Sequence, residues 1–238
     1  MRARWVAVAA LLALGVWIPA LVGVAGGARS TPPRRVTEPS VEDGSAPPAT
    51  PVFAEALGIR LHLPASSPRL VAFHEASMEG ALPMLPHGRC RPCRHPRFRP
   101  GPAADLRYAV MDPRGRGTPP TSAVDVVVGG ESRVLSPVSG RVVEVRRYRL
   151  YGRHPDVRVA IAPDGAPGIE VVLLHLRSGR LAPGDRVVAG VTPLGRARSL
   201  PFRSQVDRYA AGRRPHVHVE VVDARARDQA QGRRGPGG

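Results

Sequence analysis

Short apolar runs alternate with turn-forming residues through most of the chain from residue 52 onward. The clearest runs are residues 123–128, 141–145, 157–162, 169–176 and 216–222. They are rich in Val and Leu, and Gly, Pro, Ser and Asp separate them, which is typical of short strands. No stretch between residues 125 and 222 has the apolar spacing of a long amphipathic helix. The pattern therefore predicts a mainly β domain.

The beginning of the chain has a different pattern. Arg2 and Arg4 precede an uncharged, almost wholly apolar run over residues 5–25, which we expect to form a hydrophobic helix. Such a run is typical of an export signal or of a membrane anchor. Small residues near its end suit a signal peptidase, and its length suits a bilayer span, so both interpretations of residues 1–28 stay open. Either one predicts that the rest of the chain works outside the cytoplasm.

The remaining pattern divides the chain into segments. Residues 29–51 are rich in Pro, Ser and Thr and are expected to be a flexible linker. Residues 52–223 are expected to fold, with 121–223 as the core and 52–120 as an N-terminal extension. Whether the extension shares that core or forms a lobe over it is left open. It contains a Pro- and Arg-rich stretch, residues 83–102, that predicts a surface loop. Residues 224–238 are rich in Arg, Gly and Gln, and this composition predicts a disordered tail.

The chain carries a formal net charge of +16, and its 35 basic residues are all Arg. Arg binds phosphate and carboxylate groups well, so attraction to an anionic partner is expected, such as nucleic acid, acidic lipid headgroups or the phosphate-bearing polymers of a cell wall. The alternative is that scattered arginines only solvate the surface. A nucleic acid is not expected, because aromatic residues make up only 4% of the chain and no recognition motif is present. The absence of Lys also excludes a lipoyl or biotinyl carrier, although residues 136–143 and 184–190 resemble those domains.

The last predicted strand has a polar side. Side chains alternate between the two faces of a strand, so His216, His218 and Glu220 share one face of residues 216–222 and valines occupy the other. The two imidazoles would stand about 7 Å apart. They can belong to a metal site, or they can be structural histidines with hydrogen-bond partners.

Two further polar residues interrupt apolar strands. Asp125 lies within Ala-Val-Asp-Val-Val-Val, and His175 lies within Val-Val-Leu-Leu-His-Leu. Burial of such groups costs free energy unless they are paired. Polar groups in three apolar strands favour one shared polar cleft.

The order of these motifs resembles a known family. Asp125 is followed by Ser136-Pro-Val-Ser-Gly-Arg-Val-Val, Leu174-His-Leu, Pro183-Gly-Asp-Arg-Val-Val-Ala-Gly and Pro215-His-Val-His-Val-Glu. Residues 121–222 thereby resemble the lysostaphin-type (LytM-like) zinc endopeptidases of bacterial peptidoglycan. The resemblance implies a compact barrel-sandwich-like β domain, the duplicated hybrid motif, with peptidoglycan as its partner.

The resemblance also implies a role for each matching residue. Asp125 and His218 match zinc ligands, and His175 and His216 match the two histidines that contact the attacking water. The family has another ligand His four residues before the Asp, where this chain has Thr121. A catalytic zinc normally keeps three protein ligands, and Thr is not one of the usual ones.

Two functional hypotheses follow. With one ligand lost, zinc binding is expected to be weak or absent, and the domain would bind peptidoglycan or regulate a cell-wall hydrolase. Alternatively, a substitute ligand restores an active zinc endopeptidase. His74, in Ala72-Phe-His-Glu-Ala-Ser, is the preferred substitute, whereas His62 and His154 have weaker claims. The family's Tyr two residues before His175 is also absent, and Leu173 takes its place.

Cys90 and Cys93 form a Cys-Arg-Pro-Cys motif between two histidines. In an exported protein an even number of cysteines favours a disulfide. Free thiols and a small zinc site remain as alternatives, although a second Cys-x-x-Cys pair is missing.

Overall fold

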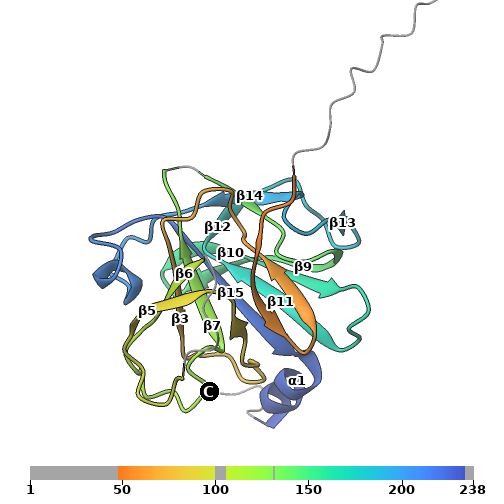
Figure 1. Ribbon diagram of the computed structural model, residues 1–238. Helices are drawn as coiled ribbons and strands as arrows, with labels where there is room; N and C mark the ends of the chain where they lie inside the picture. Colours follow the sequence, from red (N-terminus) through yellow and green to blue (C-terminus); the bar gives the residue numbers. More distant parts are fainter. Residues whose placement is uncertain (1–47, 100–105, 131, 234–238) are drawn as a thin grey trace, which may run out of the picture. The chain divides into compact units, whose positions relative to one another are not determined.

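Strands make up most of the regular structure in the described part of the chain. The computed structural model describes residues 48–99, 106–130 and 132–233, all within one unit (Figure 1). The mainly β class expected from the apolar pattern is confirmed.

The largest sheet has nine strands. Their spatial order is β13 (Arg186–Val187), β9 (Gly140–Leu150), β10 (His154–Pro163), β11 (Ile169–Leu174), β15 (His216–Asp223), β7 (Ala123–Val127), β3 (Leu70–His74), β6 (Arg107–Val110) and β5 (Arg89–Cys93). Neighbours are antiparallel except in the pairs β3–β6 and β6–β5. Among the described residues this sheet is open, with β13 and β5 at its two edges, so the expected barrel-like closure is wrong.

Two small sheets accompany the large one. The first has the order β2 (Ile59–His62), β1 (Val52–Ala56) and β4 (Leu85–Pro86). The second has the order β12 (Leu176–Ser178), β14 (Pro193–Ala197) and β8 (Arg133–Leu135). The described helices are the 3-10 turn η1 (Val206–Arg208) and α1 (Ala224–Arg233).

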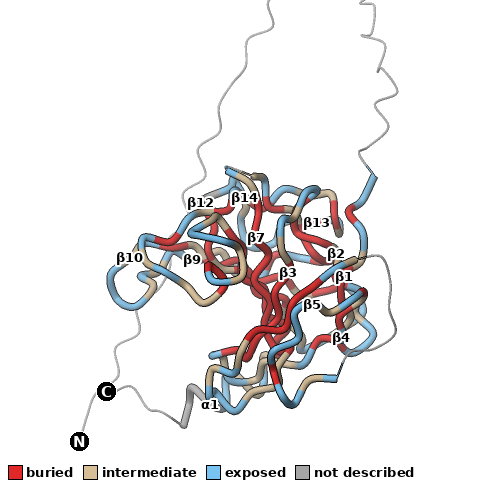
Figure 2. Tube along the Cα trace, turned by 60° about the vertical axis from the view of Figure 1, so that its left-hand side comes forward, coloured by how far each residue is buried: buried red, intermediate tan, exposed pale blue. Residues whose placement is uncertain are grey.

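The main core lies against one face of the central strands, which Figure 2 shows as the buried centre of the unit. Phe73 of β3 and Val124 of β7 contribute to it together with Val219 of β15. Phe53 of β1 joins the same core, with its ring 6.1 Å from that of Phe73. Because β3 also pairs with β7 along its length, residues 52–120 supply part of the same core and sheet.

Three segments differ from the sequence-based expectation. The Pro- and Arg-rich stretch contains β4 and β5, because β1 and β6 offer backbone partners that local composition does not reveal. The expected disordered tail begins with α1, whose first turn is capped by the Asp223 carboxylate accepting from two backbone amides. The strand expected at residues 169–176 is interrupted at His175, where the chain passes from the large sheet to a small one.

The apolar segment expected at residues 5–25 and most of the linker lie outside the described residues. Within the described ranges, no helix has the length and apolar character needed to cross a membrane. The signal and anchor interpretations therefore stay predictions.

Candidate metal centre and active-site pocket

Strand alternation gathers polar side chains on the face of the large sheet opposite the main core. In the register of the central strands, Asp125 of β7 lies directly between His218 of β15 and Ala72 of β3. His74 is two residues beyond Ala72, and Glu220 is two residues beyond His218, so both point to the same face as Asp125. The strand pairing thus unites residues from three distant parts of the sequence.

Three of these residues form a buried cluster. His74, Asp125 and His218 each offer one ligand atom, and the three atoms lie within 4.8 Å of one another. The His74 Nε2 atom is 3.3 Å from Asp125 Oδ1, and His218 Nδ1 is 2.8 Å from the same oxygen. Two imidazoles and a carboxylate are donors that zinc accepts. The cluster therefore has the composition of a three-ligand zinc site.

The ring of His74 is oriented by the backbone. Its Nδ1–H donates to the carbonyl of Glu75 over 2.9 Å, which places the lone pair on Nε2. That Nε2 atom is fully buried and has no hydrogen-bond partner. Burial also lowers the pKa of His74, against the influence of Asp125, so the ring is held neutral. A buried lone pair facing a carboxylate is what a metal ligand requires, and the residues present fit a bound zinc.

His218 is held between two carboxylates. In the protonated ring, Nδ1–H donates to Asp125 Oδ1 and Nε2–H donates to Glu220 Oε1, each over 2.8 Å. A metal would replace the Nδ1 proton and bind that nitrogen, while the Nε2–H bond to Glu220 is kept. Burial would lower the pKa of His218, but these two hydrogen bonds outweigh it and raise the pKa to about 9. Glu220 is itself buried, so it fixes the ring from the side opposite Asp125. The strand pattern predicted that Glu220 shares the face of His218, but it did not reveal the hydrogen bond between them.

His175 occupies a break between two strands. Its backbone has φ 67°, in the left-handed region that His tolerates better than most residues. The Nδ1–H donates to Asp156 Oδ2 over 2.7 Å, which leaves Nε2 as the free acceptor of the ring. Burial lowers the pKa of His175, although Asp156 opposes the shift. Asp156 was not predicted, and its position at the beginning of an apolar run, next to Val157, is the signal that could have found it.

His216 lies beside His175. The two rings meet edge to face with centroids 5.2 Å apart, and the ring of His218 is 5.9 Å from that of His175. The Nδ1–H of His216 donates to the carbonyl of Arg214 over 3.2 Å. His216 and His175 thus each use Nδ1 for positioning and keep Nε2 available.

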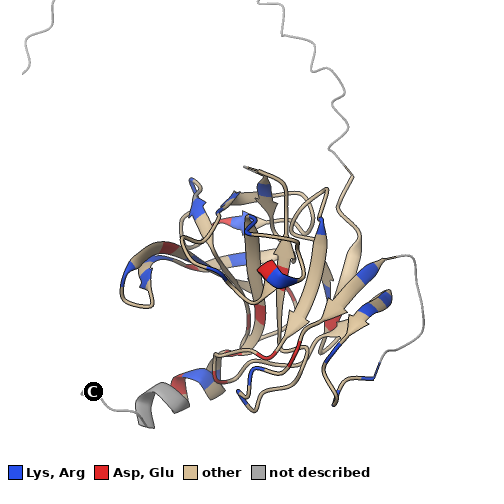
Figure 3. Ribbon diagram, turned by 90° about the vertical axis from the view of Figure 1, so that its left-hand side faces the viewer, with Lys and Arg blue, Asp and Glu red and all other residues tan. Residues whose placement is uncertain are grey.

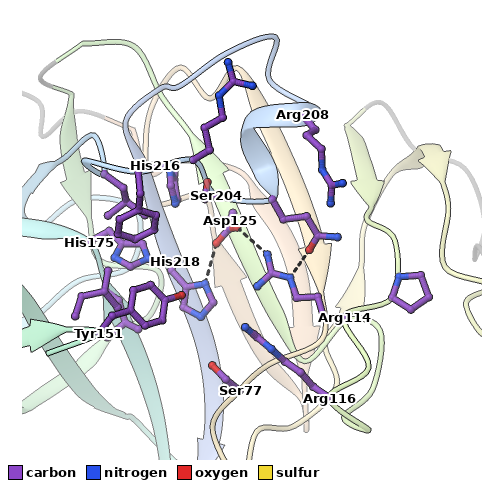
Figure 4. A pocket seen from close by; sticks show the side chains of 17 residues that line it. Ser77, Arg114, Arg116, Asp125, Tyr151, His175, Ser204, Arg208, His216 and His218 are labelled. Carbon is purple, nitrogen blue, oxygen red and sulfur yellow. Dashed lines mark hydrogen bonds and ion pairs between the residues drawn. The ribbon is translucent and has the colours of Figure 1, made fainter. Parts of the chain in front are cut away.

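One pocket of about 570 Å³ contains the expected site residues (Figure 4). Asp125, His175, His216 and His218 all line it. Polar residues in three separate apolar strand motifs predicted a shared cleft, and the structure brings these four residues together in one pocket. The pocket size is in the range of small-ligand sites.

Arginines form another part of the lining. Arg114, Arg116, Arg203 and Arg208 line the pocket. Arg114 Nη2 lies 3.7 Å from Asp125 Oδ2, which makes an ion pair with a residue of the cluster. None of these arginines was predicted as a site residue, because three lie in loops and one ends the short η1 turn, among many other arginines of the chain.

The buried Glu75 organises the loop that carries Arg114. One carboxylate oxygen accepts from the backbone amides of Arg114 and Arg116 over 2.8 and 3.0 Å. The other accepts from His95 Nε2 and from the Arg97 guanidinium. Burial would raise the pKa of Glu75, but these hydrogen bonds outweigh it and lower the pKa to about 2. A single carboxylate thus joins the strand that carries His74 to two loops.

The other sequence candidates lie elsewhere. Thr121 precedes β7, is buried, and belongs neither to the cluster nor to the pocket lining. Leu173 points into the main core. His62 contacts the carbonyl of Thr50, and the His154 ring lies 5.3 Å from that of Phe202. Neither histidine belongs to the cluster.

Cys90 and Cys93 are joined in a disulfide on β5, with Cα atoms 5.7 Å apart. This is the state that the sequence favoured over free thiols and a metal site. Neither cysteine lines the pocket.

Comparisons with known proteins give limited likenesses. No family model matches the chain, and no curated protein matches it. A zinc-containing peptidase from Vibrio cholerae is 19% identical at a TM-score of 0.31, covering 43% of this chain and 26% of that one. Lysostaphin is 21% identical at a TM-score of 0.31, and the alignment covers 42% of this chain and 35% of lysostaphin. The alignments thus span about a quarter and a third of those two proteins.

A third structure is similar over more of its length. A mutant catalytic domain of the prophage-encoded M23 protein EnpA from Enterococcus faecalis is 18% identical at a TM-score of 0.30, covering 63% of this chain and 79% of that domain. All three likenesses are weak, with identities of 18–21% and TM-scores of 0.30–0.31.

Proposed function

We propose that this chain is a zinc-dependent endopeptidase that cleaves peptide cross-links of bacterial peptidoglycan, with His74 as the third zinc ligand. Asp125 and His218 would be the other two. The motif resemblance supports the reaction and the substrate class. The position of His74 supports catalysis over the alternative in which the site is degenerate.

One observation carries this proposal. His74 Nε2 is a buried atom without a hydrogen-bond partner, 3.3 Å from the carboxylate of Asp125. Native proteins rarely leave a buried polar atom unsatisfied, and each case calls for an explanation. A cation coordinated by both atoms is that explanation, and it also removes the need for a ligand at Thr121.

The chemistry divides between the metal and the chain. A bound zinc would polarise the scissile carbonyl and make a water molecule acidic enough to attack near neutral pH. The neutral His175 can accept a proton at Nε2 from the attacking water and donate it to the departing amine nitrogen. Asp156 holds the Nδ1–H of that ring and would stabilise the imidazolium form between these two events. His216, with Nε2 free beside His175, would orient the water.

The cellular setting is part of the proposal. The apolar N-terminal segment supports export, either with cleavage or with retention at the membrane. The net charge of +16 supports attraction to an anionic cell-wall polymer. Peptidoglycan is the proposed substrate. A separate cell-wall hydrolase would be needed as a partner only if this chain did not cleave peptidoglycan itself.

The proposal is tested by hydrolysis of purified peptidoglycan. Zinc-loaded protein is expected to release new free amino groups, because each cleaved amide yields one amine. His74→Gln keeps a polar side chain of similar reach but removes the imidazole, and it is expected to reduce the rate at least about 100-fold, since even losses around a ligand cost about 10- to 100-fold.

Thr121→Ala is the matched control. It alters the position that the family motif assigns to zinc, and it is expected to leave the rate unchanged within about twofold if the enzyme is folded. Equal rates for wild type and His74→Gln would overturn the role of His74. If zinc-loaded wild type releases no amine, the endopeptidase proposal is wrong. The alternative function, a domain that binds peptidoglycan or regulates a hydrolase, is then favoured.

A further inference from the structure

The pocket has an unequal charge distribution. Four arginines line it, whereas Asp125 is the single acidic residue of the lining. Asp125 is shared between His74, His218 and Arg114, so its single negative charge cannot balance four arginines. In Figure 4, Arg114, Arg116 and Arg208 lie together on one side of Asp125, and Tyr151 and His175 lie on the other. The pocket therefore has a cationic side and an aromatic side.

Arg114 is a built feature of this cationic side and differs from the exposed arginines around it. Its side chain is only 18% exposed. Its backbone amide donates to the buried Glu75, and its Nε–H donates to the side-chain oxygen of Gln205. Gln205 is held in turn, because its amide nitrogen donates to the carbonyl of Asp112 over 2.9 Å. The guanidinium is thus preorganised at the edge of the metal centre.

The far end of that guanidinium has unused donors. Arg114 Nη2 is 3.7 Å from Asp125 Oδ2, an ion-pair distance that is too long for a hydrogen bond. No described residue accepts a hydrogen bond from Nη1 or Nη2, although a guanidinium offers five donors in a planar fork. Such a fork matches the two oxygens of a carboxylate. Among the described residues, no carboxylate lies within hydrogen-bond distance of Nη1 or Nη2. A ligand bound in the pocket would supply one.

We propose that Arg114 binds a free carboxylate of the substrate beside the scissile amide, so that the site selects acidic peptides over their amidated forms. This inference rests on the proposed function and specifies its substrate class. The neutral part of the peptide would lie on the side of Tyr151, a 72% exposed side chain of the pocket rim. Charge-assisted hydrogen bonds predict a preference of about 10- to 100-fold for the carboxylate.

The test pairs two substrates with two proteins. The substrates are synthetic branched peptides that differ in one group next to the scissile amide, a carboxylate in one and a carboxamide in the other. The proteins are the full chain and Arg114→Gln. Wild type is expected to cleave the acidic peptide with a kcat/KM about 10- to 100-fold higher, and Arg114→Gln is expected to lose most of this ratio. Fluorescence anisotropy of the labelled peptides gives the same ratio for binding, with and without zinc.

Arg60→Gln is the charge-matched control. Arg60 is an exposed residue of β2 outside the pocket, so its loss changes the net charge equally and should leave the ratio intact. If Arg114→Gln fails to fold, the ratio of kcat/KM for the two peptides is measured in Arg114→Lys instead, because this variant keeps the charge but loses the planar fork of donors. An Arg114→Lys ratio equal to that of wild type would overturn the inference.

The outcomes separate this inference from the proposed function. If wild type cleaves both peptides at equal rates and binds them equally, the endopeptidase stands and the role of Arg114 fails. If neither peptide is cleaved but the acidic one binds more tightly through Arg114, catalysis fails and the carboxylate site stands. A preference that survives in folded Arg114→Gln would contradict the inference directly.

Discussion

The orientation of His175 depends on Asp156. This carboxylate is fully buried and accepts from His175 Nδ1, from the Tyr148 hydroxyl over 2.8 Å and from the backbone amide of Val157 over 2.9 Å. A carboxylate held by three donors is itself immobile, so it fixes both the tautomer and the angle of the imidazole. Asp156 is thus a positioning residue for the proposed proton transfer.

Replacement of Asp156 tests that role. Asp156→Asn keeps the shape but removes the charge, and kcat for peptidoglycan hydrolysis is expected to fall about 10- to 100-fold while zinc stoichiometry is retained. The Asp156 charge raises the pKa of His175 against burial, so the acid limb of the pH–rate profile is expected to move to lower pH in the variant. An unchanged profile would show that Asp156 has only a structural part.

The same substitution predicts a pH dependence of stability. Burial would raise the pKa of Asp156, but hydrogen bonds from His175 and Tyr148 outweigh it, and the pKa lies below its usual 3.8. A lowered carboxyl pKa gives stability that is present above the unfolded value and lost as pH falls through the folded value. The free energy of unfolding of wild type should therefore be about 1–3 kcal/mol higher than that of Asp156→Asn at pH 7. The gap should shrink below pH 3.8 in urea titrations, and a gap independent of pH would contradict this account.

At the scale of elements, the central strands β3, β7 and β15 serve two purposes at once. One face of each contributes to the main core, and the other carries the His74, Asp125 and His218 cluster. Because side chains alternate strictly, packing on one face fixes the positions of ligands on the other. The candidate metal site is thus built on regular strands, which hold geometry better than loops do.

This division predicts that core and site can be altered separately. Val219 is fully buried in the core face of β15, between His218 and Glu220 in sequence. Val219→Ala removes two methyl groups and should lower the free energy of unfolding by about 2 kcal/mol. Zinc affinity of the folded protein should change little, because the backbone of β15 is held by strands on both sides. A large loss of zinc with a small loss of stability would contradict this separation.

Local pattern was sufficient to predict the strands that carry Asp125, His216 and His218, because period-2 alternation is visible within a few residues. The role of His74 could be predicted only as one of several alternatives, since it depends on the pairing of β3 with β7. Asp156 and Arg114 reach the site through the β9–β10 hairpin and a loop, which composition does not reveal. The open sheet, β5 and α1 depend likewise on non-local pairing and capping.

At the scale of the whole molecule, the basic character is general. Figure 3 shows Arg positions spread over strands and loops of the described part, so the overall field attracts anions without defining a site. Arg114 differs because Glu75 and Gln205 hold it beside the cluster of His74, Asp125 and His218. The proposed affinity for the cell wall and the proposed selectivity within the pocket would thus come from different arginines.

The central claim is that His74 completes a zinc site with Asp125 and His218. Zinc content after dialysis, measured by mass spectrometry together with the zinc dissociation constant, tests it most directly. Wild type and Thr121→Ala should each retain one zinc per chain, whereas folded His74→Gln should bind it at least about 100-fold more weakly. Loss of zinc in Thr121→Ala with full retention in His74→Gln would contradict the claim.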